Sequence, residues 1–224
     1  MRAFPYLSPM KLYVQPLVFN PFQENTYVVY NELREAVIID PGCSTRHEQQ
    51  VLIDFLNSKD LTPLALLNTH AHIDHVLGNA FVLRTFSIDL LLHELDLPTL
   101  RAVSNYAHLY GIDGYEPSPD PDRFITDGEK LVFGSIEFDV IFGPGHAPGH
   151  VAFYNAENSL LMGGDILFQG SYGRVDLPGG SMEVLKRTIF EKIFTLPEDT
   201  VVYPGHGPAT QIGVEKVHNY ILQS

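Results

Sequence analysis

The stretch that decides the fold is residues 69–75, Thr69-His70-Ala71-His72-Ile73-Asp74-His75. It follows the short apolar run Leu64–Leu67, which we expect to be a buried strand, and it precedes a segment with helical periodicity. Side chains alternate along an extended chain, so the imidazoles of His70 and His72 project to one side and can reach one metal ion. Asp74 and His75 lie in the following turn, where the backbone changes direction. A carboxylate and an imidazole there suit a second, adjacent ion.

Three segments rich in Gly and Pro carry further candidate ligands, and each follows an apolar strand. They are residues 143–150 with His146, residues 163–165 with Asp165, and residues 203–208 with His206. A His or Asp flanked by Gly and Pro is typical of a tight loop at a sheet edge, where functional groups tend to lie. A catalytic metal needs about three protein ligands, and an Asp can bridge two ions about 3.5–4 Å apart.

The other histidines and the cysteine are interpreted as structural. His93 and His150 are expected to be packed or hydrogen-bonded, and the rest lie on the predicted surface: His47, His108 and His218. Cys43 is the only cysteine, so the chain has no internal disulfide, and any metal must be held by His and carboxylates. This fits a reducing compartment.

The remaining sequence predicts strands followed by helices, twice. Strands are expected at 11–19, 25–31, 35–39, 64–67, 88–92, 130–133, 136–142, 151–154, 159–162 and 200–203, and helices at 45–58, 76–86, 182–194 and 214–222. Residues 94–123 are expected to be irregular and to form a wall over the metals, with Tyr106, Tyr110 and Tyr115 interpreted as packing. Because each sheet must bury both faces, we predict an α/β fold, a four-layer αβ/βα sandwich with two mixed β-sheets flanked by helices. Residues 1–224 are expected to form one domain, with 1–10 as an N-terminal extension.

The net charge and hydropathy of the chain limit which kinds of binding partner we expect. The net charge is −13, and only 14 Lys and Arg are spread along the chain, so we expect no nucleic-acid partner and no anionic membrane partner. No apolar run has the length of a signal peptide or of a membrane-spanning helix. We expect a cytoplasmic protein that acts on a small molecule; the sequence does not indicate its oligomeric state.

With all four motifs in order, the sequence resembles the metallo-β-lactamase superfamily, most closely the glyoxalase II group of hydroxyacylglutathione hydrolases, from Lys11 to about Gly213. The resemblance implies that His70, His72 and His146 hold one metal ion, that Asp74, His75 and His206 hold the second, and that Asp165 bridges them. It implies zinc, with iron or manganese as alternatives. The reaction implied is thioester hydrolysis by a hydroxide that bridges the metals, with Asp74 and Asp165 as the catalytic residues that orient it.

Departures from the family pattern bear on the substrate. Cys43 is not where one lactamase subclass has its Cys ligand, so we do not expect a lactamase. Only 18 residues follow His206, with Lys216 as the sole cation among them, so we expect no separate C-terminal glutathione-binding domain. In Gly173–Gly180, Arg174 matches the family's basic residue and is a candidate for substrate binding, whereas Asp176 replaces a Tyr. This variant resembles the short bacterial glyoxalase II-like proteins.

Three alternatives stay open. A persulfide dioxygenase would use a single iron held by His70, His146 and Asp165. A lactonase or another hydrolase of the superfamily would use the same ligands on a different substrate. A non-catalytic protein on an enzyme's scaffold is the third alternative, which fold alone does not exclude; the retention of every ligand argues against it.

Overall fold

The computed structural model describes residues 10–223, so the expected extension at 1–10 lies almost wholly outside the described residues. Within them, the strands form two six-stranded sheets and one small hairpin. The first sheet contains, in spatial order, β1 (Leu12–Phe19), β2 (Glu24–Asn31), β3 (Glu35–Ile39), β4 (Thr62–Leu67), β5 (Asp89–His93) and β6 (Arg123–Ile125). Strands β1 to β3 pair antiparallel, and β3 to β6 pair parallel, so this sheet is mixed.

The second sheet has the spatial order β14-β13-β10-β9-β8-β7. Its strands are β7 (Lys130–Phe133), β8 (Ile136–Phe142), β9 (Val151–Asn155), β10 (Leu160–Gly164), β13 (Val201–Pro204) and β14 (Thr210–Gln211). Only β10 and β13 pair parallel in it. The hairpin is β11 (Leu167–Phe168) with β12 (Ser171–Tyr172).

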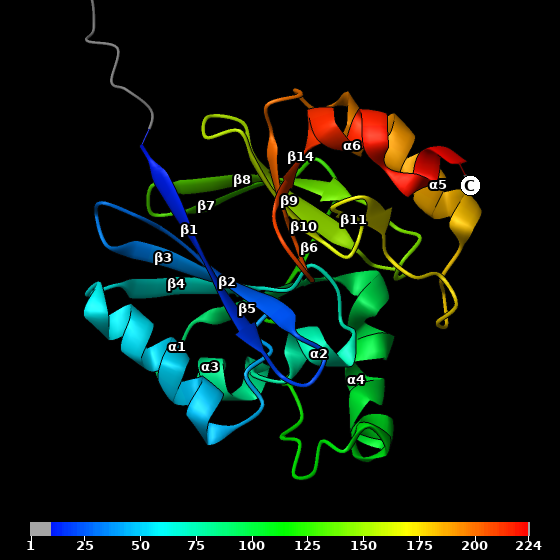
Figure 1. The fold of residues 1–224 in the computed structure, drawn as a ribbon. Coiled ribbons are helices and arrows are strands. Elements are labelled where there is room, and N and C mark those ends of the chain that lie inside the picture. The colour runs from blue at the N-terminus through cyan, green and yellow to red at the C-terminus, as the bar shows by residue number, and fades with distance from the viewer. Residues whose placement is uncertain (1–9, 224) are drawn as a thin grey trace, which may run out of the picture.

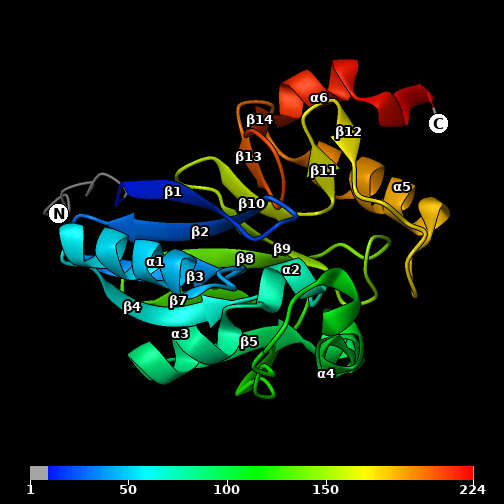
Figure 2. The same cartoon turned by 60° about the horizontal axis from the view of Figure 1, so that its bottom comes forward.

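The sheets pack face to face, and helices cover their outer faces (Figures 1 and 2). The side chains of β3 alternate between the two faces of the first sheet. Val37 and Ile39 belong to the core between the sheets, whereas Ile38 belongs to the core under the helices. The first sheet is covered by α1 (Arg46–Ser58) and α3 (Asn79–Phe86), and the second by α5 (Met182–Glu191) and α6 (Ile212–His218). The predicted four-layer αβ/βα sandwich is confirmed.

The predicted order of strands and helices is largely confirmed, and the helix start at Thr45 has a physical basis. The Thr45 side chain accepts a hydrogen bond from the Glu48 backbone, and Glu48 reaches back, which forms a capping box. The predicted helix after the motif is broken into α2 (Ile73–Val76) and α3, and the one at 182–194 ends in the short helix η3 (Ile193–Thr195). The closing helix at 214–222 is likewise divided, into α6 and η4 (Tyr220–Gln223).

The expectation of an irregular segment at 94–123 is wrong in its first part. This part contains η1 (Glu94–Asp96), α4 (Leu97–Tyr106) and η2 (Ala107–Tyr110). Pro98 stands in the first turn of α4, where its missing N–H costs no hydrogen bond, and Leu100 and Val103 bury one face. Only residues 111–122 are loop. No helix among residues 10–223 has the length and apolar character needed to cross a bilayer.

Candidate metal centre

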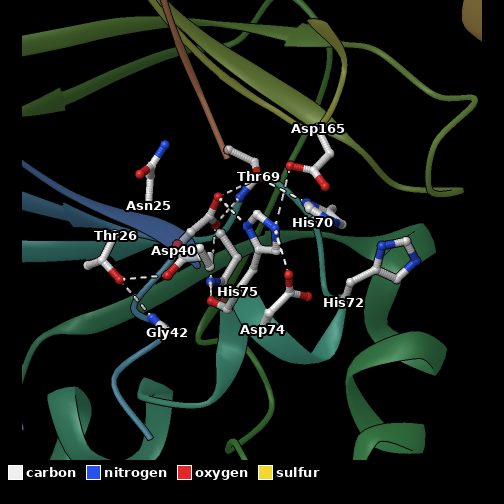
Figure 3. A network of polar contacts seen from close by, with 12 residues as sticks. Asn25, Thr26, Asp40, Gly42, Thr69, His70, His72, Asp74, His75 and Asp165 are labelled. Atoms are coloured by element: carbon white, nitrogen blue, oxygen red, sulfur yellow. Dashed lines mark hydrogen bonds and ion pairs between the residues drawn. The ribbon is translucent and has the colours of Figure 1, made fainter. Parts of the chain in front are cut away.

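The candidate ligands come from four segments that meet where strands of both sheets end. Residues 69–75 follow β4, His146 lies between β8 and β9, Asp165 follows β10, and His206 follows β13. Backbone hydrogen bonds tie these segments together: the Val151 amide donates to the Thr69 carbonyl at 2.8 Å, and the Gly205 amide donates to the Gly164 carbonyl at 2.8 Å. Figure 3 shows Asp165 facing the side chains of His70, Asp74 and His75 from the other sheet.

One cluster consists of His70, His72 and His146. The Nε2 atom of His146 lies 2.8 Å from Nδ1 of His72 and 3.2 Å from Nε2 of His70. His70 and His146 are almost fully buried. Three imidazole nitrogens at such distances can share one metal ion, and His70 and His72 lie on the same side of the chain, as alternation predicts.

A second cluster consists of Asp74, His75 and His206. The Asp74 carboxylate lies 3.1 Å from Nε2 of His206 and 3.7 Å from Nε2 of His75. These three ligand atoms are also close enough to share one ion. Asp74 and His75 therefore lie in a different cluster from His70 and His72, as the change of backbone direction after His72 predicts.

Asp165 lies between the two clusters. Its Oδ2 atom is 3.5 Å from Nε2 of His146 in the first cluster and 3.6 Å from Nε2 of His206 in the second. Its Oδ1 atom is 3.5 Å from Nε2 of His75. A carboxylate in this place can contact two ions at once.

The donor atoms fit divalent metal ions, because buried atoms that face the clusters lack other partners. Among the described residues, neither His75 Nε2 nor Asp165 Oδ1 has a hydrogen-bond partner, although both are buried. Their contact with each other, at 3.5 Å, is longer than a good hydrogen bond. Buried polar atoms are normally satisfied, so a cation between these two atoms would supply the missing partner. Imidazole and carboxylate groups bind zinc, iron and manganese, so this set of donor atoms does not discriminate between the three metals.

Outer contacts fix the orientation of the imidazoles. His146 Nδ1 donates to the Arg174 carbonyl at 2.7 Å, which leaves Nε2 for the cluster. His75 Nδ1 lies 3.1 Å from Asp40 Oδ2, and the same carboxylate accepts hydrogen bonds from the Thr69 amide and hydroxyl. Such contacts select the tautomer and direction of a metal-binding histidine. The sequence alone assigned no role to Asp40, although a carboxylate at the carboxyl end of a strand beside β4 was a usable signal.

Asp96 was missed as well. Its side chain is buried and accepts from the Ala71 amide at 2.8 Å and from the Gly149 amide at 2.6 Å. Ala71 lies between His70 and His72, and Gly149 lies in the His146 loop. Burial raises the pKa of Asp96 to about 6, and the two backbone hydrogen bonds act in the opposite direction. One carboxylate therefore joins the two loops that supply the first cluster.

The two clusters differ in electrostatics. Burial, followed by the neighbouring His146, lowers the pKa of His72 to about 3, and burial also holds the pKa values of His70 and His146 below their ordinary range. Burial acts the same way on His75 and His206, but the carboxylates of Asp74 and Asp165 outweigh it and raise both pKa values. In the metal-free protein, the surroundings of the first cluster therefore disfavour protonation of its imidazoles, whereas those of the second favour it.

The structural histidines lie where the sequence places them. His150 Nε2 accepts from the Asp165 amide at 2.9 Å, and its ring stacks on His70. His93 stacks on Phe142 and accepts from the Leu95 amide. The remaining three are exposed: His47, His108 and His218. Cys43 is fully buried in the core under the first sheet.

Comparison with known proteins identifies the family, because residues 19–206 match the metallo-β-lactamase superfamily. The chain belongs to this superfamily. Among curated relatives, it is 37% identical to the probable metallo-hydrolase YqgX of Bacillus subtilis, over 90% of this chain and 93% of the relative. It is 36% identical to the hydroxyacylglutathione hydrolase GloC of Haemophilus influenzae, over 91% of this chain and 94% of the relative.

Solved structures of the superfamily agree with this fold. The B3 metallo-β-lactamase BLEG-1 superposes with a TM-score of 0.86 and is 40% identical, covering 95% of this chain and all of that chain. The protein TTHA1623, solved in a di-iron-bound form, has a TM-score of 0.82 and 39% identity, covering 92% of this chain and 99% of that chain.

In this member of the metallo-β-lactamase superfamily, a cavity of about 870 Å³ opens directly beside the two clusters. One wall comes from α4 and η2, and the other comes from β11, β12 and the loop that leads to α5. The segment 94–110 therefore forms the expected wall. Tyr106 and Tyr115 pack against the core beneath α4, as interpreted, and the Tyr115 hydroxyl accepts from the Ser118 amide. Tyr106 also lines the cavity, and so does Tyr110, which is exposed rather than packed in that core.

Arg174 also lines the cavity, as expected of a substrate-binding residue. Its guanidinium is exposed and forms two hydrogen bonds of 2.7 Å with the Asp176 carboxylate. The positive charge of Arg174 is therefore already paired with the negative charge of Asp176.

Proposed function

We propose that the protein is a binuclear metal-dependent hydrolase that acts on a small thioester of the hydroxyacylglutathione type. The observation that carries the proposal is the position of Asp165, whose two oxygens approach both clusters. His70, His72 and His146 would hold one ion, and Asp74, His75 and His206 the other. Two divalent cations, when bound, supply Lewis acidity that lowers the pKa of water from ~15.7 toward neutrality and polarises a carbonyl.

The chain's own residues supply orientation and charge. The pKa of Asp165 is held low because nearby imidazoles, led by His75, outweigh the effect of burial, so the group is ionised at neutral pH. The pKa of Asp74 is lowered in the same way. Both carboxylates can accept hydrogen bonds from a water molecule and direct its lone pair at the substrate carbonyl. A thiolate is a good leaving group, so the reaction needs no further proton donor.

The catalytic roles do not require a side-chain nucleophile. Cys43 is buried away from the cavity lining, and burial raises the pKa of its thiol. Ser171 is exposed and has no histidine among its hydrogen-bond partners within the described residues. Water is therefore the nucleophile that this arrangement favours. The 36% identity to a hydroxyacylglutathione hydrolase supports the choice of a thioester.

Alanine substitution of His72 or Asp165 tests the proposal. Each change removes one donor from a cluster, so the number of bound ions per chain should fall, and hydrolysis of S-lactoylglutathione and other thioesters should fall by about 100-fold or more, at least as much as the loss of an outer contact causes. His218→Ala is the matched control, because that histidine is exposed and outside the cavity. Retention of wild-type hydrolysis by Asp165→Ala would refute the proposal.

A second candidate is β-lactam hydrolysis, because a B3 metallo-β-lactamase is 40% identical across its whole length. The position of Cys43 argues only against the subclass with a cysteine ligand. A lactam carbonyl could occupy the same place as a thioester carbonyl. The β-lactam nitrocefin should therefore be assayed together with the thioesters. A higher kcat/KM for nitrocefin than for every thioester would favour β-lactam hydrolysis.

A further inference from the structure

The cavity walls beyond the candidate metal ligands are mostly apolar or aromatic. On the α4–η2 side, Tyr110 makes edge contacts with Tyr106 and Phe22, with ring centroids 6.0 Å and 5.6 Å apart. On the opposite side, Phe168 packs its ring near His206, with Leu177 further along the wall. Sites for apolar ligands are built this way, with aromatic surface around a few polar groups.

The lip of the cavity exposes apolar side chains to solvent. Leu109 is 75% exposed and Tyr110 is 51% exposed, and both line the cavity. Apolar surface gathered at the mouth of a cavity marks a site for an apolar ligand. A substrate group that filled the cavity would cover these side chains and gain their burial free energy.

Cations are scarce around the cavity. Among residues 10–223, Arg174 is the only Lys or Arg that lines it, and the Asp176 carboxylate already accepts hydrogen bonds from its Nε and Nη2 atoms. Lys216, the cation closest to the C-terminus, instead contacts the Leu196 carbonyl and Glu198. Glutathione carries two carboxylates, and a carboxylate removed from water without a partner costs free energy. The cavity can match at most one of them, by displacing Asp176.

We propose that the preferred substrates are thioesters with an aromatic or branched aliphatic acyl group on an uncharged thiol carrier. The inference rests on the proposed hydrolysis of a thioester at the metal centre, and it replaces the hydroxyacylglutathione type by a different acyl group and a different thiol carrier. The acyl group packs against Tyr106, Leu109 and Tyr110, and the carrier passes along the β11–β12 wall. Glutathione gives no advantage as a carrier.

The kinetic test compares matched thioesters on the metal-loaded protein. Phenylacetyl and acetyl thioesters of N-acetylcysteamine differ only in the acyl group, and kcat/KM should be at least tenfold higher for phenylacetyl, since one buried group changes discrimination by about 10–200-fold. Phenylacetyl glutathione should be no better than phenylacetyl N-acetylcysteamine. Leu109→Ser and Tyr110→Ser should reduce the phenylacetyl preference at least threefold. Leu33→Ser, at a leucine that is 57% exposed and outside the cavity, should not change it.

A binding test separates the inference from the proposed function. The thioether S-benzyl-N-acetylcysteamine cannot be hydrolysed, and calorimetry on the metal-free protein should show it binding at least tenfold more tightly than S-methylglutathione. If S-lactoylglutathione is hydrolysed at least tenfold more efficiently than phenylacetyl N-acetylcysteamine, the inference is wrong and the proposed function stands. If no thioester is hydrolysed with both metals bound, the proposed function is wrong. Tighter binding of S-methylglutathione than of the benzyl thioether would overturn the inference independently of activity.

Discussion

At the scale of single residues, Asp96 shows how a carboxylate outside the clusters can control their geometry. Each of its two oxygens accepts one backbone N–H, from Ala71 and from Gly149. A Cβ on Gly149 would press against the Asp96 backbone and side chain, so the two segments are in close contact. The distance between the His70–His72 segment and the His146 loop therefore depends on this one side chain.

Asp96→Asn should weaken metal binding at the first cluster about tenfold or more, as the loss of outer contacts typically does. The amide keeps the shape but places an N–H donor against a backbone N–H, which leaves a buried donor unpaired. Competition with a chelator measures the affinity. The matched control is Asp120→Asn, at an exposed aspartate that pairs with Arg101. Equal affinities in both variants would show that Asp96 does not position the ligands.

The opposite pKa shifts of the two clusters predict different pH dependence of metal binding to the metal-free protein. His72, with its pKa lowered to about 3, is unprotonated at pH 6 and at pH 8, so its cluster binds without releasing protons. His75 and His206 have raised pKa values, so a second ion must displace protons, and its affinity falls as the pH is lowered through those values. Calorimetry at pH 6 and 8 in buffers of different ionisation enthalpy should find proton release with the second equivalent of zinc only. Equal release with both equivalents would contradict this assignment.

Residue identity indicated which side chains would gather at the candidate metal centre, because imidazole and carboxylate chemistry is local and the spacing around His70 is short. It could not predict Asp96, and it assigned no role to Asp40, although the place of Asp40 at the carboxyl end of a strand was a usable signal. Their roles depend on which backbone amides and imidazoles fold against them, and that is decided by segments far along the chain, such as Gly149 beside Asp96.

At the scale of elements, loops rather than strands determine where the ligands lie. Gly145 has a φ of +128°, a conformation that residues with a Cβ rarely adopt, and a Cβ there would collide with the Leu185 backbone on α5. The His146 loop can lie against α5 only because of this glycine. Gly205 is similar, since a Cβ would collide with the Asp165 carboxylate.

Gly145→Ala should lower the free energy of unfolding by about 3 kcal/mol or more, because it adds a backbone collision to the cost of an unfavourable φ. Gly128→Ala is the matched control: its φ is +74°, and nothing lies within 4 Å of the added Cβ. We expect that change to cost only about 1–2 kcal/mol. Urea unfolding measures both, and an equal loss would show that contact with α5 is unimportant.

Elements with clear periodicity were predictable, whereas short ones were not. Strand β3 and helix α1 were found because a short apolar run between turn residues and an amphipathic run with helical period are strong local signals. The two-residue strands β11, β12 and β14 contain too few residues for a period to appear. Helix α4 had a usable signal, Pro98 at its start, but the loop residues at 111–122 obscured it.

At the scale of the whole molecule, each cluster draws ligands from both sheets. Residues 70–75 follow a strand of the first sheet, whereas His146, Asp165 and His206 follow strands of the second. The layered architecture was predictable from strands and helices that occur twice in order. The pairing of distant ligands was not, and it came only from the family resemblance.

Metal ions would therefore join the two halves of the sandwich and stabilise the entire fold. A ligand at 100 times its Kd adds about 2.7 kcal/mol to the free energy of unfolding. For a chain of this size, that corresponds to a rise in Tm of about 5–11 °C. Scanning calorimetry before and after chelation should show this difference for the wild type and a much smaller one for His72→Ala. An unchanged Tm in the wild type would mean that metal does not bridge the halves.

The most direct test of the two-metal hydrolase is elemental analysis of the purified protein, combined with turnover. The account predicts about two divalent ions per chain and hydrolysis of a thioester, with both lost in Asp165→Ala. A single iron per chain, with oxygen uptake on glutathione persulfide and no thioester hydrolysis, would contradict it.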